Sequence, residues 1–418
     1  MKLGFLGLFV MVLSLRAYQC IIREHKISPF IKTMERRTQF GIKMLQIEST
    51  HIKQENFAMT PFSTWSLMLM FFEAADVGKF AYNELQKVLD LSLEYPKLRM
   101  WYEDARVYHH FDSENTKLFS LRYAYYDDDK DIIFVEEFNS TVLSGEGNVV
   151  LKEGQPRAVK FTEGASEIIN ADIAKASHGK ILGTYSRSSF NRNDTILGLT
   201  VSYFKAKWKY PFDKSQTKVE QFYDSSGKPA GKVNMMVQTG KFAYIRSIKR
   251  LDADFLMLPF AEQELVMIVI LPKPSHSVSQ VLNQFKSYRL VPILNMLNDS
   301  KNETDVEVKL PKFDTLSVLP LVRPLNEAGI TELNYYEFPE LERMLIADGF
   351  RSVYLSHYDQ FARIVVDEEG LPDAVPQKSS GTDNKFKFHM NRPFAYFVLE
   401  KNYKLLLHSG VFQKGDVQ

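Results

Sequence analysis

The sequence Val366-Asp367-Glu368-Glu369-Gly370 ends an apolar run that begins at Tyr354, and Pro393-Phe394-Ala395-Tyr396-Phe397 opens another. Between them, residues 371–387 are rich in Gly, Pro, Ser, Thr, Asp and Asn and show almost no apolar periodicity. Such a composition is typical of turns and loops. The C-terminal part of the chain therefore predicts a long exposed loop, residues 371–387, between two buried strands.

Composition favours one globular domain. The chain has 418 residues, of which 45% are hydrophobic and 13% aromatic, enough for a packed core. A formal net charge of +1 predicts no strong attraction to nucleic acid or to acidic membranes. Helical and strand-like patterns do not alternate strictly, which favours an α+β fold with large mixed sheets. We see no internal repeat or linker, so residues 18–418 are expected to form a single domain.

The N-terminus predicts a secreted, extracellular protein. Met1-Lys2 precedes an apolar run from Leu3 to Leu15 and the small residue Ala17, a pattern typical of a signal peptide over residues 1–17. The alternative is a membrane anchor, but the run is shorter than the ~20 residues that a spanning helix needs. Cys20 is the single cysteine, so the expected monomer has no internal disulfide; Cys20 stays a free thiol or pairs between chains.

Four Asn-X-Ser/Thr sequons support the secretory route, because N-linked glycans are added there. Two of them are only four residues apart, so we do not expect both to carry a glycan. The candidate sites are Asn139, Asn193, Asn298 and Asn302.

Apolar periodicity places helices mainly in the first part of the chain and strands mainly in the second. Lys205, Lys207 and Lys209 alternate with apolar residues, which predicts a strand with one solvated face. The expected helices are Ile31–Glu48, Phe62–Ala75, Ala81–Leu91, Ala165–Ala176 and Leu319–Ala328. The expected strands are Leu118–Tyr126, Ile196–Trp208, Phe255–Phe260 with Leu265–Pro272 as a hairpin, Val306–Phe313 and Tyr354–Val366.

Seven short motifs follow one another along the chain. They are Asn56 to Ser63, Ile169-Asn170 with Gly179-Lys180-Ile181, Tyr203 to Trp208, Met236 to Tyr244, Leu258-Pro259-Phe260 with Ile270-Leu271-Pro272, Leu310 to Phe313 with Leu325 to Ile330, and Asn391 to Phe394. In this order and at these spacings they resemble the motifs of the serpin family of protease inhibitors. The resemblance covers about residues 30 to 414. Each motif is weak alone, and it is their order that makes the set specific.

The resemblance implies a fold of three β-sheets and eight or nine α-helices with an exposed reactive-centre-like loop. In inhibitory members a serine protease cleaves this loop, which then inserts as a new central strand of the largest sheet and deforms the attached protease. Stored strain and a completed sheet supply the energy. The resemblance thus implies an extracellular serine protease as a candidate partner.

The loop hinge departs from the inhibitory pattern. The hinge residues are Glu369, Gly370, Leu371, Pro372 and Asp373, whereas inhibitory members usually follow the glycine with threonine and several small residues. Pro372 and Pro376 have no N–H for a central strand, and alternation from Leu371 turns Asp373 toward the core. We therefore predict a non-inhibitory, substrate or binding type of serpin, with an unknown protein or ligand as partner. The alternative is an active inhibitor that acts through the exposed loop.

Two further sets of residues follow from the resemblance. The family's polar cluster that controls opening of the sheet maps to Asn56, Thr60, Ser63, Thr200 and Gln360. Here Thr60, Thr200 and Gln360 replace the family's Ser, Asn and His, which predicts altered sheet opening. The candidate scissile region is Thr382, Asp383, Asn384 and Lys385.

No motif of an enzyme is present. The sequence lacks G-x-S-x-G, H-E-x-x-H, a P-loop and a dinucleotide fingerprint, so we expect no catalysis, no cofactor and no metal. His109-His110 is the only adjacent histidine pair and predicts a partly buried surface pair in preference to a metal site. Arg246, Lys249 and Arg250 favour a solvated turn over a glycosaminoglycan site.

Overall fold

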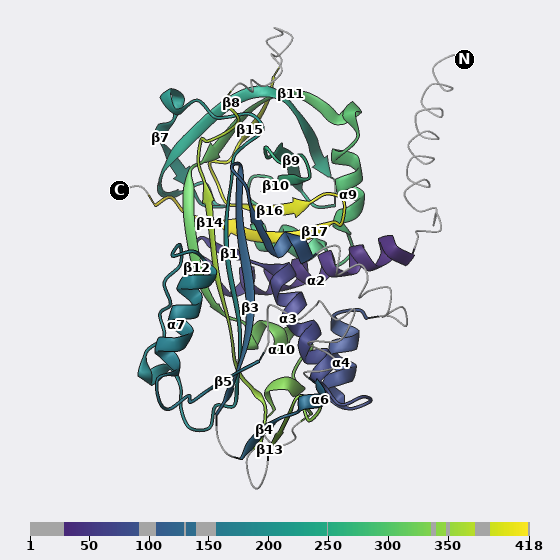
Figure 1. The fold of residues 1–418 in the computed structure, drawn as a ribbon. Coiled ribbons are helices and arrows are strands. Elements are labelled where there is room, and N and C mark those ends of the chain that lie inside the picture. The colour runs from purple at the N-terminus through teal and green to yellow at the C-terminus, as the bar shows by residue number, and fades with distance from the viewer. Residues whose placement is uncertain are drawn as a thin grey trace, which may run out of the picture.

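The computed structural model describes residues 29–91, 106–128, 131–138, 156–248, 250–335, 340–347, 352–372 and 385–416. Two large sheets lie one above the other in Figure 1, with most helices beside or across them. Within the described residues, none of the helices is long and apolar enough to cross a membrane.

A six-stranded sheet extends along the molecule, from the level of β16 and β17 down to that of β5 (Figure 1). Its strand β6 is buried along nearly its whole length, because α7 covers one face of the sheet and α3 the other. The strand order is β12-β14-β6-β3-β2, with β5 beside β3. The strands are β12 Phe313–Pro320, β14 Leu355–Val366, β6 Ile196–Ala206, β3 Thr116–Asp127, β2 His110–Asp112 and β5 Arg157–Val159.

A nine-stranded sheet forms the upper half, and a two-stranded sheet of β4 and β13 lies at the lower end (Figure 1). The nine strands are β1 Phe57–Met59, β17 Leu405–Phe412, β16 Phe394–Glu400, β10 Leu265–Pro272, β9 Ala253–Pro259, β8 Pro229–Ile248, β11 Glu303–Pro311, β15 Phe386–His389 and β7 Lys218–Tyr223. The small sheet consists of β4 Ile132–Phe134 and β13 Leu345–Ala347.

Eight α-helices lie within the described residues, and several short 3-10 turns connect them to the strands. The α-helices are α2 Pro29–His51, α3 Pro61–Ala74, α4 Phe80–Val88, α6 Glu136–Phe138, α7 Ala165–Ala176, α8 Val278–Gln284, α9 Leu290–Leu297 and α10 Val322–Ala328. The 3-10 turns are Arg106–His109, Arg187–Ser189, Lys214–Gln216, Ser300–Asn302 and Glu332–Asn334. The expected α+β architecture with three sheets is confirmed.

The predicted helix Leu319–Ala328 begins too early. Leu319 and Pro320 belong to β12, and α10 starts only at Val322. Proline is compatible with β12 because this strand lies at the edge of its sheet. Pro324 lies in the first turn of α10, where backbone N–H groups have no partner within the helix. Gly329 ends α10 with φ 100°, a left-handed conformation that favours glycine.

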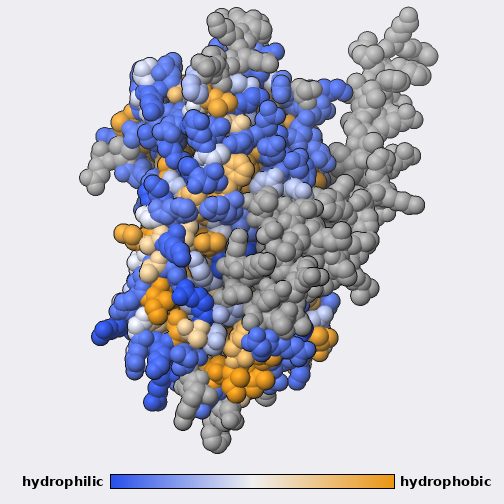
Figure 2. Space-filling view, in the orientation of Figure 1, coloured by the Kyte–Doolittle hydropathy of each residue, from blue (hydrophilic) through white to orange (hydrophobic). Residues whose placement is uncertain are grey.

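Figure 2 shows a mostly hydrophilic face with an apolar patch near its lower end, where Figure 1 places β4 and β13. Ile133 and Ile346 pair across these two strands and are both exposed. One side of the small sheet therefore adds apolar surface to this end of the molecule.

Candidate functional site

The seam between β6 and β14 lies directly before the hinge, and it is where the loop insertion implied by the serpin resemblance would take place. These two strands run parallel, with a register that extends from Leu355 opposite Ile196 to Val365 opposite Lys205. The seam is therefore closed along its whole length. It lies in the six-stranded sheet, and β14 leads from it into the hinge.

Beyond β14 the hinge pairs with the chain that follows β6. Gly370 forms a parallel bridge with Trp208, whose N–H donates to the Glu369 carbonyl (2.8 Å). The Leu371 N–H in turn donates to the Trp208 carbonyl (3.0 Å). A Cβ at Gly370 would lie 2.6 Å from the Pro211 backbone, so this close approach requires glycine.

Charged side chains fix the hinge from both sides. The Glu368 carboxylate is 5% exposed and accepts hydrogen bonds from Lys312 Nζ (2.8 Å) and Thr217 Oγ1 (3.0 Å). Burial acts to raise the pKa of Glu368, but the bonds from Lys312, the backbone and Thr217 outweigh it and lower the pKa. The carboxylate is therefore held ionised at the hinge.

The alternating pattern predicted that Lys205 lies on a solvated face of its strand. In the structure this part of the face is covered instead. The Lys205 Nζ is 2.8 Å from Asp367 Oδ2 and 3.2 Å from Glu369 Oε2. The alternation was right for the strand, but the hinge acids cover this part of its face. Lys207 is 3.4 Å from Glu114, an exposed partner.

A buried polar cluster joins the seam to α3. The side chain of Gln360 on β14 is fully buried, and its Oε1 accepts from the Thr60 N–H (2.8 Å). Its Nε2 donates to Thr64 Oγ1 (2.9 Å) and to Thr200 Oγ1 on β6 (3.1 Å). Ser63 bonds to Ser120 on β3. Glutamine at 360 thus bridges β14, β6 and α3 with its own hydrogen bonds.

The structure does not place Asn56 in this cluster. Its Oδ1 accepts from the N–H groups of Gln413 (2.7 Å) and Lys414 (3.1 Å), so it binds the C-terminal segment beside β1. Thr64 and Ser120 belong to the cluster and were missed. Their only signal in the sequence is a hydroxyl inside an otherwise apolar stretch.

The connection from α7 to β6 crosses over the opposite face of the seam. The Tyr185 hydroxyl donates to Asp359 Oδ2 on β14 (2.7 Å), and Arg363 Nη1 donates to the Lys180 carbonyl. Arg363 also forms a two-bond ion pair with Asp314 on β12 (2.8 and 2.6 Å). Opening the seam would therefore require the bonds from Tyr185 to Asp359 and from Arg363 to the Lys180 carbonyl to break, whereas Asp314 on β12 lies on the same side of the seam as β14.

A model of the family described as serpin (serine protease inhibitor) matches residues 35–414, nearly the whole chain. The chain belongs to the serpin family. Serine protease inhibitor 2 of Anopheles gambiae is 27% identical over 394 residues, covering 90% of this chain and 91% of that protein. Human antithrombin-III is 29% identical, over 60% of this chain and 54% of its own length.

Solved serpin structures share the fold. The native state of the thermophilic serpin tengpin has a TM-score of 0.75 at 19% identity and covers 92% of this chain and 94% of its own. Serpin-12 of Manduca sexta has a TM-score of 0.76 at 20% identity, covering 92% and 99%. Serpins are mostly protease inhibitors and not catalysts, which agrees with the missing enzyme motifs.

Several predicted site residues of this serpin lie outside the described residues. They include the signal segment 1–17, Cys20, the sequon Asn139, Lys249, and the loop residues Asp373, Pro376, Thr382, Asp383 and Asn384. Of the scissile region only Lys385 is described; it is exposed and directly precedes β15.

The three described sequons differ in how available their side chains are. Asn193 and Asn298 are exposed. Asn302 is half-buried, and its Nδ2 donates to the Met296 carbonyl (2.7 Å). Because the glycan would be attached to this nitrogen, the structure favours Asn298 over Asn302.

His109 is not the partly buried surface residue that the sequence predicted. It is fully buried, stacks on Phe62 with ring centroids 4.3 Å apart, and lies against Arg122. Burial and the Arg122 charge lower its pKa, so it stays neutral. His110 is exposed. Within the described residues no group of His, Cys, Asp and Glu could hold a metal ion.

Proposed function

We propose that this chain is a secreted serpin that binds a partner or serves as a substrate, and that does not trap proteases by loop insertion. The observation that carries the proposal is the hinge Leu371-Pro372 beyond the closed β6–β14 seam, which Asp373 follows in the sequence. Insertion would have to replace the register between these two strands with hydrogen bonds from the loop.

Proline weakens that replacement. Leu371 donates the last backbone bond of the hinge, to Trp208, and Pro372 directly after it has no N–H to give. Pro376 repeats the defect four residues later. A strand inserted between β6 and β14 has a neighbour on each side, and each buried carbonyl left without a donor costs ~1–3 kcal/mol.

Asp373 would add a charge to an uncharged environment. In an inserted strand Asp373 would share a face with Leu371, and we expect this to be the face of the sheet that packs on α3. Along the seam this face presents uncharged side chains: Phe204, Ser202 and Thr200 on β6, and Ile364, Ala362 and Gln360 on β14. An ionised carboxylate without a cation there costs several kcal/mol, so insertion loses much of its driving force.

Secretion is part of the same proposal. It rests on the signal-like segment 1–17 and on the exposed sequons Asn193 and Asn298. Expression in a eukaryotic secretory host followed by mass spectrometry tests it. The expected product starts near residue 18 and carries glycan on Asn193; a product that retains residues 1–17 with bare asparagines would refute secretion.

The loop is tested by cutting it between Lys378 and Lys387 and measuring thermal unfolding. We expect a nearly unchanged midpoint for the nicked wild type, and a large rise for the Pro372→Ala/Asp373→Ala/Pro376→Ala variant. The matched control, Ser379→Ala/Ser380→Ala/Thr382→Ala, changes three residues of the same loop beyond the hinge and should behave as wild type. A hyperstable nicked wild type would overturn the proposal.

An active inhibitor of an extracellular serine protease is the second candidate. The hinge glycine, which matches the inhibitory pattern, favours it, as does the name of the mosquito relative. Incubation with trypsin, chymotrypsin and elastase distinguishes the two. A complex that survives SDS supports the inhibitor, whereas cleavage of the loop without such a complex supports the substrate or binding role.

A further inference from the structure

A hollow of about 310 Å³ lies on the surface between α2, α4 and the segment that joins α8 to α9. Figure 1 shows α2 extending between α4 below it and α9 above it. This hollow is remote in sequence from the loop, the hinge and the seam. Its lining includes Phe40, Lys43, Lys87, Phe285, Lys286 and Arg289.

The floor of the hollow is apolar. Phe40 and Ile42 of α2, with Leu282 and Phe285 from α8 and its C-terminus, are at most 3% exposed and belong to the main core. Val88 of α4 is partly buried beside them. The part of the hollow nearest the core therefore offers a surface on which a hydrocarbon or aromatic group loses contact with water.

The rim of the hollow is basic. Its charged members are Lys43, Lys87, Lys286 and Arg289, against a single acid, Asp90, so the lining carries a net charge of +3 (four cations minus one anion). Burial, followed by the positive charges of Lys87 and Lys286, lowers the pKa of Lys43. The ammonium groups are thus near enough to repel one another.

Within the described residues, carboxylates do not neutralise these lysines. Lys43 Nζ donates to the Ala328 carbonyl at the end of α10 (2.7 Å), which fixes its position but not its charge. Over the part of the chain that the structure describes, Lys43, Lys87 and Lys286 have no carboxylate partner. An anion placed between them would remove the mutual repulsion.

The uncharged polar groups of the lining are already engaged. Gln46 Nε2 donates to Asn283 Oδ1 (2.8 Å), and Gln39 Nε2 donates to the Tyr288 carbonyl (3.4 Å). The lysines are therefore the groups that remain to orient a ligand. Small-molecule sites typically have a volume of ~300 Å³ or more and an apolar surface with a few polar groups that orient the ligand. This hollow has the same features.

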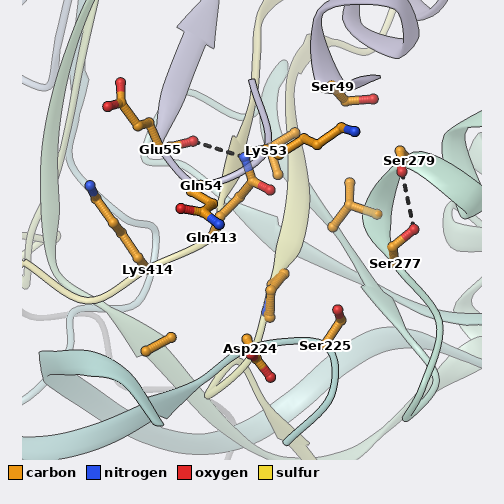
Figure 3. Close-up of a pocket in the computed structure, with 14 residues that line it drawn as sticks. Ser49, Lys53, Gln54, Glu55, Asp224, Ser225, Ser277, Ser279, Gln413 and Lys414 are labelled. Atoms are coloured by element: carbon orange, nitrogen blue, oxygen red, sulfur yellow. Dashed lines mark hydrogen bonds between the residues drawn. The ribbon is translucent and has the colours of Figure 1, made fainter. Parts of the chain in front are cut away.

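A second hollow, of about 610 Å³, has a different character (Figure 3). It lies between the end of α2, the segment after β7 and the start of α8, and Figure 3 shows Ser49, Ser225, Ser277 and Ser279 around it. Its charged side chains are Lys53, Lys414, Glu55 and Asp224, which sum to zero. Lys53 and Lys414 are exposed like Lys87 and Lys286, and so provide a matched control.

We propose that the hollow between α2, α4 and α8 binds a small amphipathic anion, with its carboxylate or sulfate between Lys43, Lys87 and Lys286 and its apolar body on the Phe40 and Phe285 floor. Binding at this hollow does not depend on whether the reactive loop inserts. Protein loaded at this site would transport or sense such a ligand while its loop remained intact.

Isothermal titration calorimetry with sodium decanoate and sodium decyl sulfate, both below micelle formation, tests the proposal on the full-length secreted chain. Decanol lacks the charge and sodium sulfate lacks the apolar body, so each should bind at least tenfold more weakly than decyl sulfate. Binding of only one of the two amphiphiles would identify the head group. Raising the salt concentration should weaken binding, since the attraction is partly electrostatic.

Two charge-reversal variants locate the site. Lys87→Glu/Lys286→Glu should weaken binding at least tenfold, whereas Lys53→Glu/Lys414→Glu, with the same change of net charge, should bind as wild type. Thermal unfolding checks that both variants fold. Should the Lys87/Lys286 variant misfold, Val88→Trp, which fills the hollow without changing charge, takes its place and should also abolish binding. Equal weakening by both charge variants, or unchanged binding in Val88→Trp, would overturn the assignment.

Discussion

Replacing Gln360 with methionine should destabilise this serpin by about 3 kcal/mol while leaving the volume of the side chain almost unchanged. The side chain is fully buried, so water cannot replace what it loses. The Thr60 N–H would have no acceptor in place of Gln360 Oε1, which costs ~1–3 kcal/mol. The bonds to Thr64 and Thr200 would be lost as well, at ~0.5–1 kcal/mol each.

Urea unfolding followed by circular dichroism measures this loss. Thr200→Val serves as the control, because it removes one of the bonds at the same volume and should cost about 1 kcal/mol. The two substitutions share that bond, so Thr200→Val should cost less in the Gln360→Met background than in the wild type. A loss below about 1 kcal/mol for Gln360→Met, or strictly additive costs, would show that Gln360 does not join β6 and β14 to α3.

Three further predictions concern pH, glycosylation and the α7 connection. Burial lowers the pKa of His408 from 6.5 to about 3, so the unfolded state takes up the proton first and stability falls as pH drops below 6.5, by about 2 kcal/mol at pH 5. Urea midpoints at pH 7 and pH 5 should differ less in His408→Gln than in wild type; an equal difference would contradict this. Glycopeptide mapping should find glycan on Asn298 and little on Asn302, and the reverse occupancy would show that the amide bond to Met296 does not persist. Tyr185→Phe removes a donor to the half-buried Asp359 carboxylate and should cost about 2 kcal/mol of unfolding free energy, whereas a neutral effect would mean that water replaces the hydroxyl.

The order of elements in this serpin was largely readable from the sequence. The hairpin of β9 and β10, the helix α7 and the strand β14 follow from local apolar periodicity and from the turn residues between them. These signals involve neighbours along the chain, so no tertiary information is needed to detect them. The boundary at Leu319 was wrong, because Pro320 is compatible with an edge strand as well as with a helix start.

At the hinge, the sequence predicts the properties of single residues but not their contacts in space. The sequence alone determined that Pro372 has no N–H and that Gly370 lies two residues before it. It also determined that Asp373 would share a face with Leu371 in an extended strand. That Gly370 is required because of Pro211 was decided only by the fold. The partner of a side chain in space can come from any part of the chain, and it depends on the register of strands that are far apart in sequence.

Contacts between segments that are far apart in sequence also explain why the predictions for Lys205 and Asn56 were incomplete or wrong. The sequence determined that Lys205 lies on a strand, but only the tertiary structure brought Asp367 and Glu369 to its face. A family motif assigned Asn56 to the polar cluster, whereas the closing strands at the C-terminus draw it to Gln413. The basic hollow has no sequence signature, because its lysines belong to α2, to α4 and to the segment after α8, which only packing brings together. Local patterns determine secondary structure, while the pairing of charges and polar groups is a property of the assembled fold.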